Sequence, residues 1–197
     1  MIGRTDDVFF LPQIGYFVNR TCTPEWIIER QKIDFHDLTF VISGKGEYII
    51  NDVSYPVTQG DMIYVKSGSW REANTSAAQT MVLYAFNMQL FDQYFAPATL
   101  PFEVLTKLEP DPKIDHLLER IRQLYTLREA TGVMQTTAVF MELIAQVLIN
   151  TGMVKGASSD PRVQKAAAYV MENINRHISA TEIGQAVGVH PGYLNKL

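Results

Sequence analysis

Hydrophobic and polar residues alternate along much of the first ninety positions. Short runs rich in valine, isoleucine, phenylalanine and tyrosine are separated by breaks that contain glycine, proline or asparagine, which is typical of β-strands joined by turns. The pattern predicts strands over residues 13–19, 25–31, 37–42, 47–50, 54–57, 62–65 and 79–87. This many short strands favour an antiparallel sandwich or a small barrel.

From residue 111 the apolar spacing changes to three and four, the period of an α-helix. One predicted helix begins at Asp111-Pro112, and a second covers residues 133–150. Both helices could cover the open side of the strands, or they could supply a dimer interface. Because their apolar stripes are broad, we expect one helix to have apolar surface to spare. These stripes include Leu117, Leu118 and Ile121 in the first helix and Val139, Phe140 and Leu143 in the second.

The last stretch of the chain contains the signals of two short helices. Ser179 and Glu182 have the spacing of a reciprocal capping box, and Gly188 stands where a left-handed residue ends a helix. Pro191 suits the first turn of a following helix. Two short helices around a glycine turn indicate a helix-turn-helix, although an ordinary pair of helices packed on a core has the same geometry.

The run from Ile178 to Leu197 resembles the first helix-turn-helix of AraC/XylS-type transcription regulators. The matching positions are Ala186, Gly188, Val189, Pro191, Tyr193 and Leu194, and His190 replaces the usual serine. The resemblance implies DNA contacts by His190, Gly192, Asn195 and Lys196. Because the chain ends inside the second helix of the motif, we interpret residues 161–197 as a truncated DNA-binding domain. DNA is then a partner of the full-length form, and we expect the 197-residue form to bind it weakly.

Charge and composition refine this interpretation. The net charge of −4 argues against phosphate binding by the whole chain, but residues 161–197 carry four basic and two acidic side chains. We find no run of eighteen apolar residues and no apolar signal segment at the N-terminus, so we expect a soluble, cytoplasmic protein with no membrane contact. Cys22 is the only cysteine, which excludes an internal disulfide and a cysteine-based zinc cluster.

The strand region resembles a cupin, the barrel that AraC-type regulators use as a sensor. The resemblance rests on the residues V-I-S-G-K-G-E at 41–47, Y-P-V-T-Q-G-D-M-I-Y-V at 55–65 and S-G-S-W at 67–70. Gly44, Gly46 and Gly60 have a purely structural interpretation as well, since hairpin corners need positive φ.

Many cupins are metalloenzymes, so a metal site is the first function that the resemblance implies. The family's ligand positions fall near Gln31, Ile33, Asp37 and Arg71, and His36 has no second imidazole nearby in the sequence. Three or four converging ligands are needed. We therefore predict no metal, no cofactor, no catalytic residue and no enzymatic activity. The alternative is a cupin-fold enzyme, an isomerase or dioxygenase, or a stand-alone protein that binds a small molecule.

Large amphipathic side chains remain in the strand region. We predict that Arg30, Tyr48, Tyr64, Trp70 and Arg71 contact a small-molecule effector, a sugar or an organic acid. Alternatively, each aromatic ring only fills the core.

The sequence therefore predicts an α+β chain of four parts. These are a cupin-like antiparallel β-barrel sensor with an N-terminal arm (1–109), a helical dimerisation segment (110–151), a linker (152–160) and an incomplete helix-turn-helix domain (161–197). The predicted function is a ligand-responsive, homodimeric transcription regulator of the AraC type, in which an effector in the barrel controls sequence-specific DNA binding.

Overall fold

The computed structural model describes residues 10–127, 131–154 and 161–189. The chain divides into two compact units, Met1–Val154 and Lys155–Leu197, which we call the N-terminal unit and the C-terminal unit.

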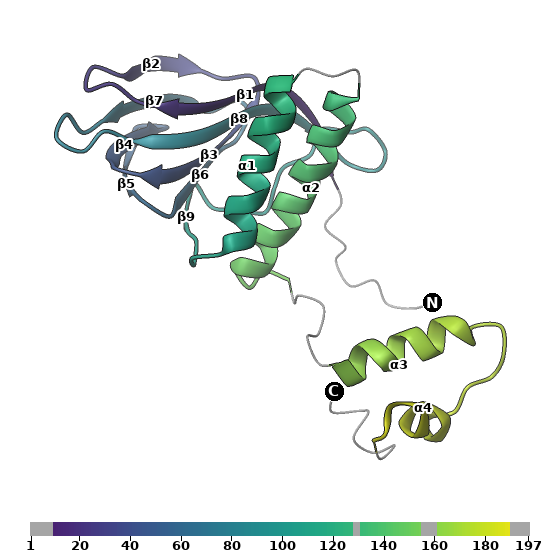
Figure 1. The fold of residues 1–197 in the computed structure, drawn as a ribbon. Helices are drawn as coiled ribbons and strands as arrows, with labels where there is room; N and C mark the ends of the chain where they lie inside the picture. Colours follow the sequence, from purple (N-terminus) through teal and green to yellow (C-terminus); the bar gives the residue numbers. More distant parts are fainter. Residues whose placement is uncertain (1–9, 128–130, 155–160, 190–197) are drawn as a thin grey trace. The chain divides into compact units, whose positions relative to one another are not determined.

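The N-terminal unit contains two antiparallel sheets (Figure 1). The five-stranded sheet consists, in order, of β1 (Leu11–Thr21), β8 (Val82–Phe91), β3 (His36–Ser43), β6 (Asp61–Val65) and β9 (Leu105–Lys107). The four-stranded sheet consists, in order, of β2 (Ile27–Lys32), β7 (Trp70–Thr75), β4 (Lys45–Ile50) and β5 (Val53–Thr58). The predicted α+β class with an antiparallel strand region at its N-terminal end is confirmed.

Strand alternation divides the apolar side chains between two cores. Val41 of β3 and Leu83 of β8 belong to a cluster between the two sheets, together with Tyr48 of β4. Leu38 and Phe40 of β3 point the other way, into a larger cluster on the outer face of the five-stranded sheet. Since successive residues of a strand face opposite sides, this assignment also decides which polar residues enter the sandwich.

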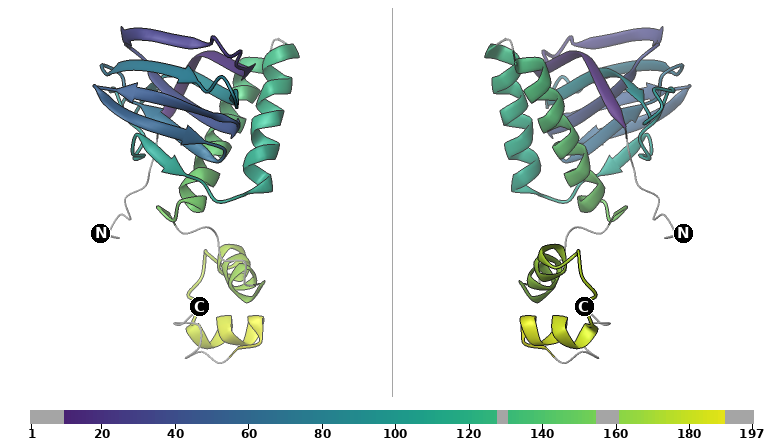
Figure 2. Two further views of the ribbon diagram at one scale, coloured as in Figure 1. Left: turned by 90° about the vertical axis from the view of Figure 1, so that its left-hand side faces the viewer. Right: turned by 90° about the vertical axis from the view of Figure 1, so that its right-hand side faces the viewer.

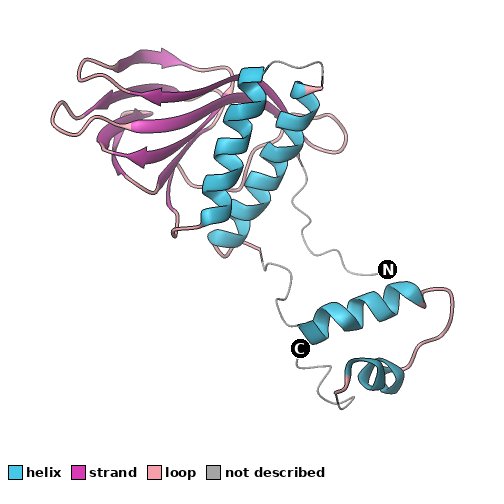
Figure 3. Cartoon of the chain, in the orientation of Figure 1, coloured by secondary structure: helices cyan, strands magenta, loops and turns pink. Residues whose placement is uncertain are grey.

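Two helices, α1 (Pro112–Leu127) and α2 (Gly132–Asn150), cover that outer face (Figures 1 and 2). The Phe86 ring of β8 lies 4.8 Å from the Phe17 ring of β1 and 4.9 Å from the Phe140 ring of α2, measured between centroids. These contacts join sheet to helix, so the N-terminal unit has three layers: four-stranded sheet, five-stranded sheet and helix pair (Figure 3).

The apolar helix residues on which we based the expectation of spare apolar surface are buried in this packing. The six side chains concerned are at most 4% exposed: Leu117, Leu118, Ile121, Val139, Phe140 and Leu143. These six residues are therefore not the spare apolar surface, because the five-stranded sheet presents an apolar outer face that both helices cover. α2 does expose other apolar side chains, Val133, Met134 and Ile149. Dimerisation through residues 110–151 stays a prediction.

Within the described residues, α2 is the one helix long and apolar enough to cross a membrane. Its buried residues include Phe140, Ile144 and Val147, which pack on the helix pair's side of the sheet. The core helix of a soluble protein has the same composition as a membrane span, so this property is weak evidence for a membrane segment.

Two strands were not predicted from the sequence. β7 begins at Trp70, between the strands predicted at 62–65 and 79–87, and β9 lies between the last predicted strand and the first predicted helix. Of the three glycines assigned to hairpin corners, Gly44 and Gly60 have φ of 81° and 83°, whereas Gly46 has no positive φ. Gly46 is required for another reason: a Cβ there would lie 2.4 Å from the carbonyl oxygen of Asn74 on the neighbouring strand.

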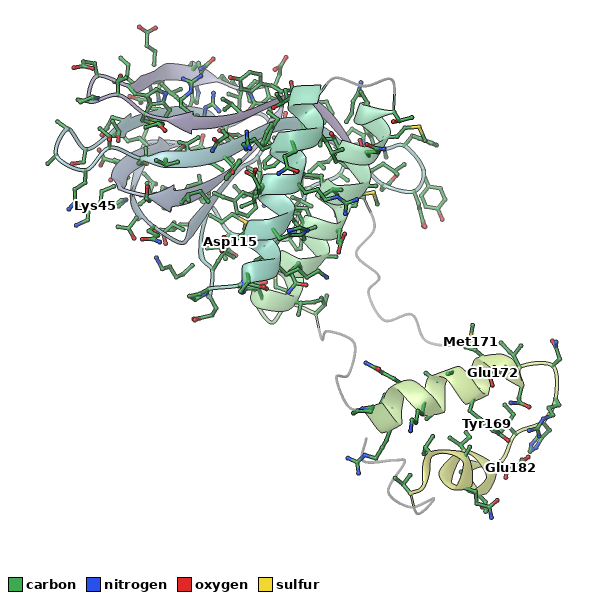
Figure 4. All side chains as sticks on the ribbon, viewed as in Figure 1. Lys45, Asp115, Tyr169, Met171, Glu172 and Glu182 are labelled. Carbon is green, nitrogen blue, oxygen red and sulfur yellow. The ribbon has the colours of Figure 1, made fainter. Side chains whose placement is uncertain are left out.

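The C-terminal unit contains α3 (Pro161–Glu172) and α4 (Ala180–Val187). The predicted capping box is present, since the Ser179 side chain accepts from the Glu182 N–H and the Glu182 side chain accepts from the Ser179 N–H. Gly188 ends α4 with φ of 72°, as predicted. Arg176 then joins the helices, because its guanidinium donates to the Tyr169 hydroxyl at 3.0 Å and to Glu182 at 2.8 Å. Figure 4 labels Tyr169 and Glu182 in this unit.

The residues predicted to contact DNA, His190, Gly192, Asn195 and Lys196, lie outside the described residues. The same holds for most of the predicted linker, residues 155–160. The domain boundaries and the DNA contacts therefore stay predictions.

Candidate functional site: a polar cavity between the two sheets

A cavity of about 370 Å³ lies between the two sheets. Strands β1, β2, β3, β4, β7 and β8 all contribute to its wall. The lining residues are Tyr16, Val18, Arg20, Trp26, Ile27, Ile28, Glu29, Gln31, Asp37, Thr39, Tyr48, Arg71, Leu83, Ala85 and Asn87. This volume is at the lower end of the range for small-molecule sites.

The most polar part of the wall is an ion pair between Arg71 of β7 and Asp37 of β3. Nη1 of Arg71 donates to Oδ2 of Asp37, and the two side chains are 8% and 2% exposed. The guanidinium also lies over the ring of Phe35, with Cζ 5.5 Å from the centroid. The two sheets are therefore joined inside the sandwich by a charge pair as well as by apolar contacts.

A hydroxyl group extends this pair, and a phenol lies in the same wall. Thr39 Oγ1 donates to Oδ1 of Asp37 at 3.1 Å, and Tyr48 lines the same cavity. Burial raises the pKa of Asp37 above its ordinary value, while Arg71 and Thr39 act in the opposite direction. Burial also raises the pKa of Tyr48, so this phenol stays protonated and acts as a hydrogen-bonding group.

Of the five residues predicted to contact an effector, the cavity contains Tyr48 and Arg71. Arg30 and Trp70 lie together on the other face of the four-stranded sheet, with the Arg30 guanidinium 4.4 Å from the indole centroid. Arg30 there pairs with Asp52 at 2.7 Å and with Glu72 at 3.2 Å. The expected grouping of all five in one pocket was therefore wrong.

Tyr64, the fifth residue, faces the helix side of the five-stranded sheet. Its hydroxyl lies 2.8 Å from Nδ1 of His36 and accepts from the Leu100 N–H at 3.0 Å. Since that hydroxyl accepts from Leu100, its own proton is available for Nδ1, which fits a neutral imidazole. Burial lowers the pKa of His36, and Lys66 acts in the same direction. The hydrogen bond from the Leu100 N–H to Tyr64 holds the segment after β8 against the sheet, so the Tyr64–His36 pair has a structural role.

The donor set of the cavity does not fit a metal ion. Of the positions that the resemblance assigns to ligands, Asp37 supplies a carboxylate, but Arg71 already pairs with it. Within residues 10–127, 131–154 and 161–189, no group of three or more His, Cys, Asp or Glu side chains is placed to hold a metal. Bound cations need several converging lone pairs, and a guanidinium offers none.

A larger cavity of about 590 Å³ lies between the five-stranded sheet and α1. Two of its four acidic residues have protein partners: Asp61 pairs with Lys107 at 3.1 Å, and Asp111 accepts from Gln146 at 2.7 Å. The other two are Glu109 and Asp115.

Asp37 was predicted only as a position near a metal ligand, and Thr39 was not predicted to belong to a site. The signal was available, because Asp37 is the one charged residue in an apolar run ending at Ile42. A carboxylate in a buried strand needs a partner, and arginine is the most suitable one.

The cupin domain family model matches residues 34–86, which span β3 to most of β8. The sandwich contains a cupin domain. The matched range includes Asp37, Thr39, Tyr48 and Arg71, so the polar part of the cavity belongs to the cupin domain itself.

Several solved structures are similar to the chain. Oxalate decarboxylase of Bacillus subtilis matches with a TM-score of 0.33 and 22% identity, over 41% of this chain and 22% of that one. ToxT of Vibrio cholerae, an AraC-family regulator, matches with a TM-score of 0.42 and 13% identity, over 98% of this chain and 75% of that one. AerE of Microcystis aeruginosa matches with a TM-score of 0.37 and 20% identity, over 48% and 43% of the two chains.

This chain spans less than a quarter of the oxalate decarboxylase chain. A search by sequence among curated proteins found no match. Our prediction that the chain is not an enzyme is corrected to an open assignment: oxalate decarboxylase, an enzyme, is among the distant and partial structural neighbours, and these do not assign an activity to this chain. The absence of familiar catalytic motifs does not exclude this class for a cupin domain.

Proposed function

We propose that this chain acts in ligand-responsive transcription regulation of the AraC type. In this proposal a small molecule binds in the cavity between the sheets, and the C-terminal unit belongs to the part that reads DNA. Binding would shift the population of the regulator between states that bind DNA differently.

The observation that carries the proposal is the construction of α4. A reciprocal capping box at Ser179 and Glu182 opens this helix, and Gly188 closes it in the left-handed region. These are the local features expected of the first helix of a helix-turn-helix. The motif follows a cupin domain that has a polar cavity, which supports a sensor joined to an output element.

The charge distribution also supports ligand binding by the N-terminal unit and DNA binding by the C-terminal unit. The segment 161–197 has more basic than acidic side chains, whereas the whole chain carries a net charge of −4. A basic segment on an acidic protein limits phosphate contact to that segment. The regulator would act as a homodimer, because a two-fold DNA site requires a two-fold protein.

The test is a mobility-shift titration of the full-length protein against the DNA around its own gene. We expect sequence-specific binding whose affinity falls as salt rises. Sedimentation of the same sample should give a species of dimer mass. Binding that does not distinguish this DNA from a scrambled duplex, or a monomer at all concentrations, would refute the proposal.

A further inference from the structure

The guanidinium of Arg71 retains a buried donor, Nε, that no protein atom satisfies. Its Nη1 donates to Asp37, but its Nε has no hydrogen-bond partner. Among the buried side-chain nitrogen and oxygen atoms of the described residues, this is the only one in that condition. Proteins pair nearly all buried donors, so an unpaired donor on a residue that lines the cavity marks a place where a ligand acceptor would be favourable.

The charges of the cavity wall are balanced. Asp37 and Arg71 form an ion pair, and the other charged lining residues, Arg20 and Glu29, are again one of each sign. A ligand carboxylate at Nε of Arg71 would add a second negative charge close to Asp37, and no cation of the inner wall would compensate it. Burial of an uncompensated charge is unfavourable, whereas a hydroxyl or carbonyl oxygen satisfies the donor without changing the charge.

The remaining wall suits a small molecule with apolar surface. Trp26, Ile28 and Leu83 line the cavity, and its volume of about 370 Å³ leaves room for a molecule of roughly monosaccharide size. Polar partners other than Arg71 are also present, since Gln31 and Asn87 line the same cavity.

We propose that the cavity selects an uncharged polar molecule, which presents a hydroxyl or carbonyl oxygen to Nε of Arg71, and that it discriminates against carboxylates. The inference rests on the proposed function only in the assumption that this cavity is the effector site. It decides between the two effector classes, sugar and organic acid, in favour of the uncharged one.

The test uses two probes of nearly identical shape, acetamide and acetate, with the complete chain labelled with nitrogen-15 at arginine. The Nε–H signal of Arg71 is assigned by its loss in Arg71→Lys, which keeps the positive charge. We expect acetamide to shift this signal with an affinity about tenfold or more above that of acetate. Equal or tighter binding of acetate would overturn the inference, and so would a signal that neither probe shifts.

The variant Asp37→Asn provides a matched charge change in the same wall. Without the aspartate charge, we expect acetate to gain affinity and at least to equal acetamide. An unchanged preference in a folded Asp37→Asn variant would show that wall charge does not set selectivity. These outcomes are independent of the mobility-shift experiment. If the cavity does not discriminate against carboxylates, the regulator proposal still stands. If the protein does not bind DNA specifically, the inference about ligand charge still stands.

Discussion

Arg71 and Asp37 form an ion pair across the interior of the sandwich, with less than a tenth of either side chain exposed. Arg71 comes from the four-stranded sheet and Asp37 from the five-stranded sheet. The pair therefore links the two sheets at the wall of the cavity, and it combines a structural role with the proposed recognition role.

The first prediction concerns the stability that depends on this pair. Arg71→Met leaves the Asp37 carboxylate buried without a cation, so we expect a loss of about 3–5 kcal/mol in the free energy of unfolding. The double variant Arg71→Met/Asp37→Leu removes both charges and should recover much of that loss. Urea unfolding followed by tryptophan fluorescence measures both variants.

The matched control is Arg30→Met, which breaks a pair of the same chemical type on the exposed face. Arg30 is paired with Asp52 and Glu72, but its side chain is 42% exposed. Water and salt weaken such pairs, so the variant should unfold close to the parent protein. Equal losses for Arg30→Met and Arg71→Met would contradict a special role of burial.

The second prediction concerns His36 and acid. Because the folded-state pKa of His36 is lowered from the ordinary value of 6.5, the unfolded chain takes up the proton first as pH falls. Stability should be fully present above pH 6.5 and should decrease below it, down to the folded-state pKa. Urea midpoints measured on both sides of this pH give the slope.

His36→Gln is the control for this slope, because glutamine can accept from Tyr64 but does not titrate. The variant should lose the part of the pH dependence that lies just below 6.5, even if it is less stable throughout. A slope in His36→Gln as steep as in the parent would assign the effect to other groups.

Local signals were predicted well from the sequence. The capping box at Ser179 and Glu182 and the turn at Gly188 depend on residues only a few positions apart, so spacing alone identifies them. Asp111 is a similar case, since its carboxylate accepts from the Lys113 N–H at the start of α1, where a helix was predicted to begin.

The cavity could not be assembled in the same way, because its membership depends on strand register. Counting in twos from Ile28 places Arg30 on the inner face, but the β2–β7 pairing shifts register between Ile28 and Gln31. As a result Gln31 lines the cavity, and Arg30 lies on the opposite face. A bulge of this kind changes the face of every following residue and leaves no clear mark in the sequence.

The placement of Trp70 and Arg71 in one pocket was wrong for a simpler reason. They are neighbours on β7, and neighbouring residues of a strand point to opposite faces, so both could not have lined one pocket. Because residues 70–75 were not predicted to be a strand, this alternation could not be used to place Trp70 and Arg71 on opposite faces.

The third prediction compares two glycines with positive φ. Gly44 and Gly68 have φ of 81° and 87°, so alanine adds roughly 1–2 kcal/mol of backbone strain at either position. At Gly44 the new Cβ would also lie 2.1 Å from the backbone oxygen of Thr80, whereas at Gly68 nothing lies within 4 Å. Gly44→Ala should therefore destabilise the sandwich much more than Gly68→Ala, as measured by thermal unfolding.

Equal effects of the two substitutions would show that φ alone matters, and that the segment containing Thr80 moves aside without cost. Gly44 lies between β3 and β4, within the residues that the cupin domain model matches, so a large effect would locate a rigid corner of that domain.

The last prediction concerns the start of α4. Ser179→Ala removes the hydroxyl that accepts from the Glu182 N–H, so the first turn of the helix should lose about 1 kcal/mol. Hydrogen exchange of the amides in that turn should quicken by about five-fold, from the same free energy. Thr181→Ala is the control, because Thr181 lies inside the helix and replacement by alanine, a better helix former, should slow exchange or leave it unchanged. If Ser179→Ala and Thr181→Ala behave alike, the capping box does not hold α4 in solution, and the observation on which the regulator proposal depends loses its force.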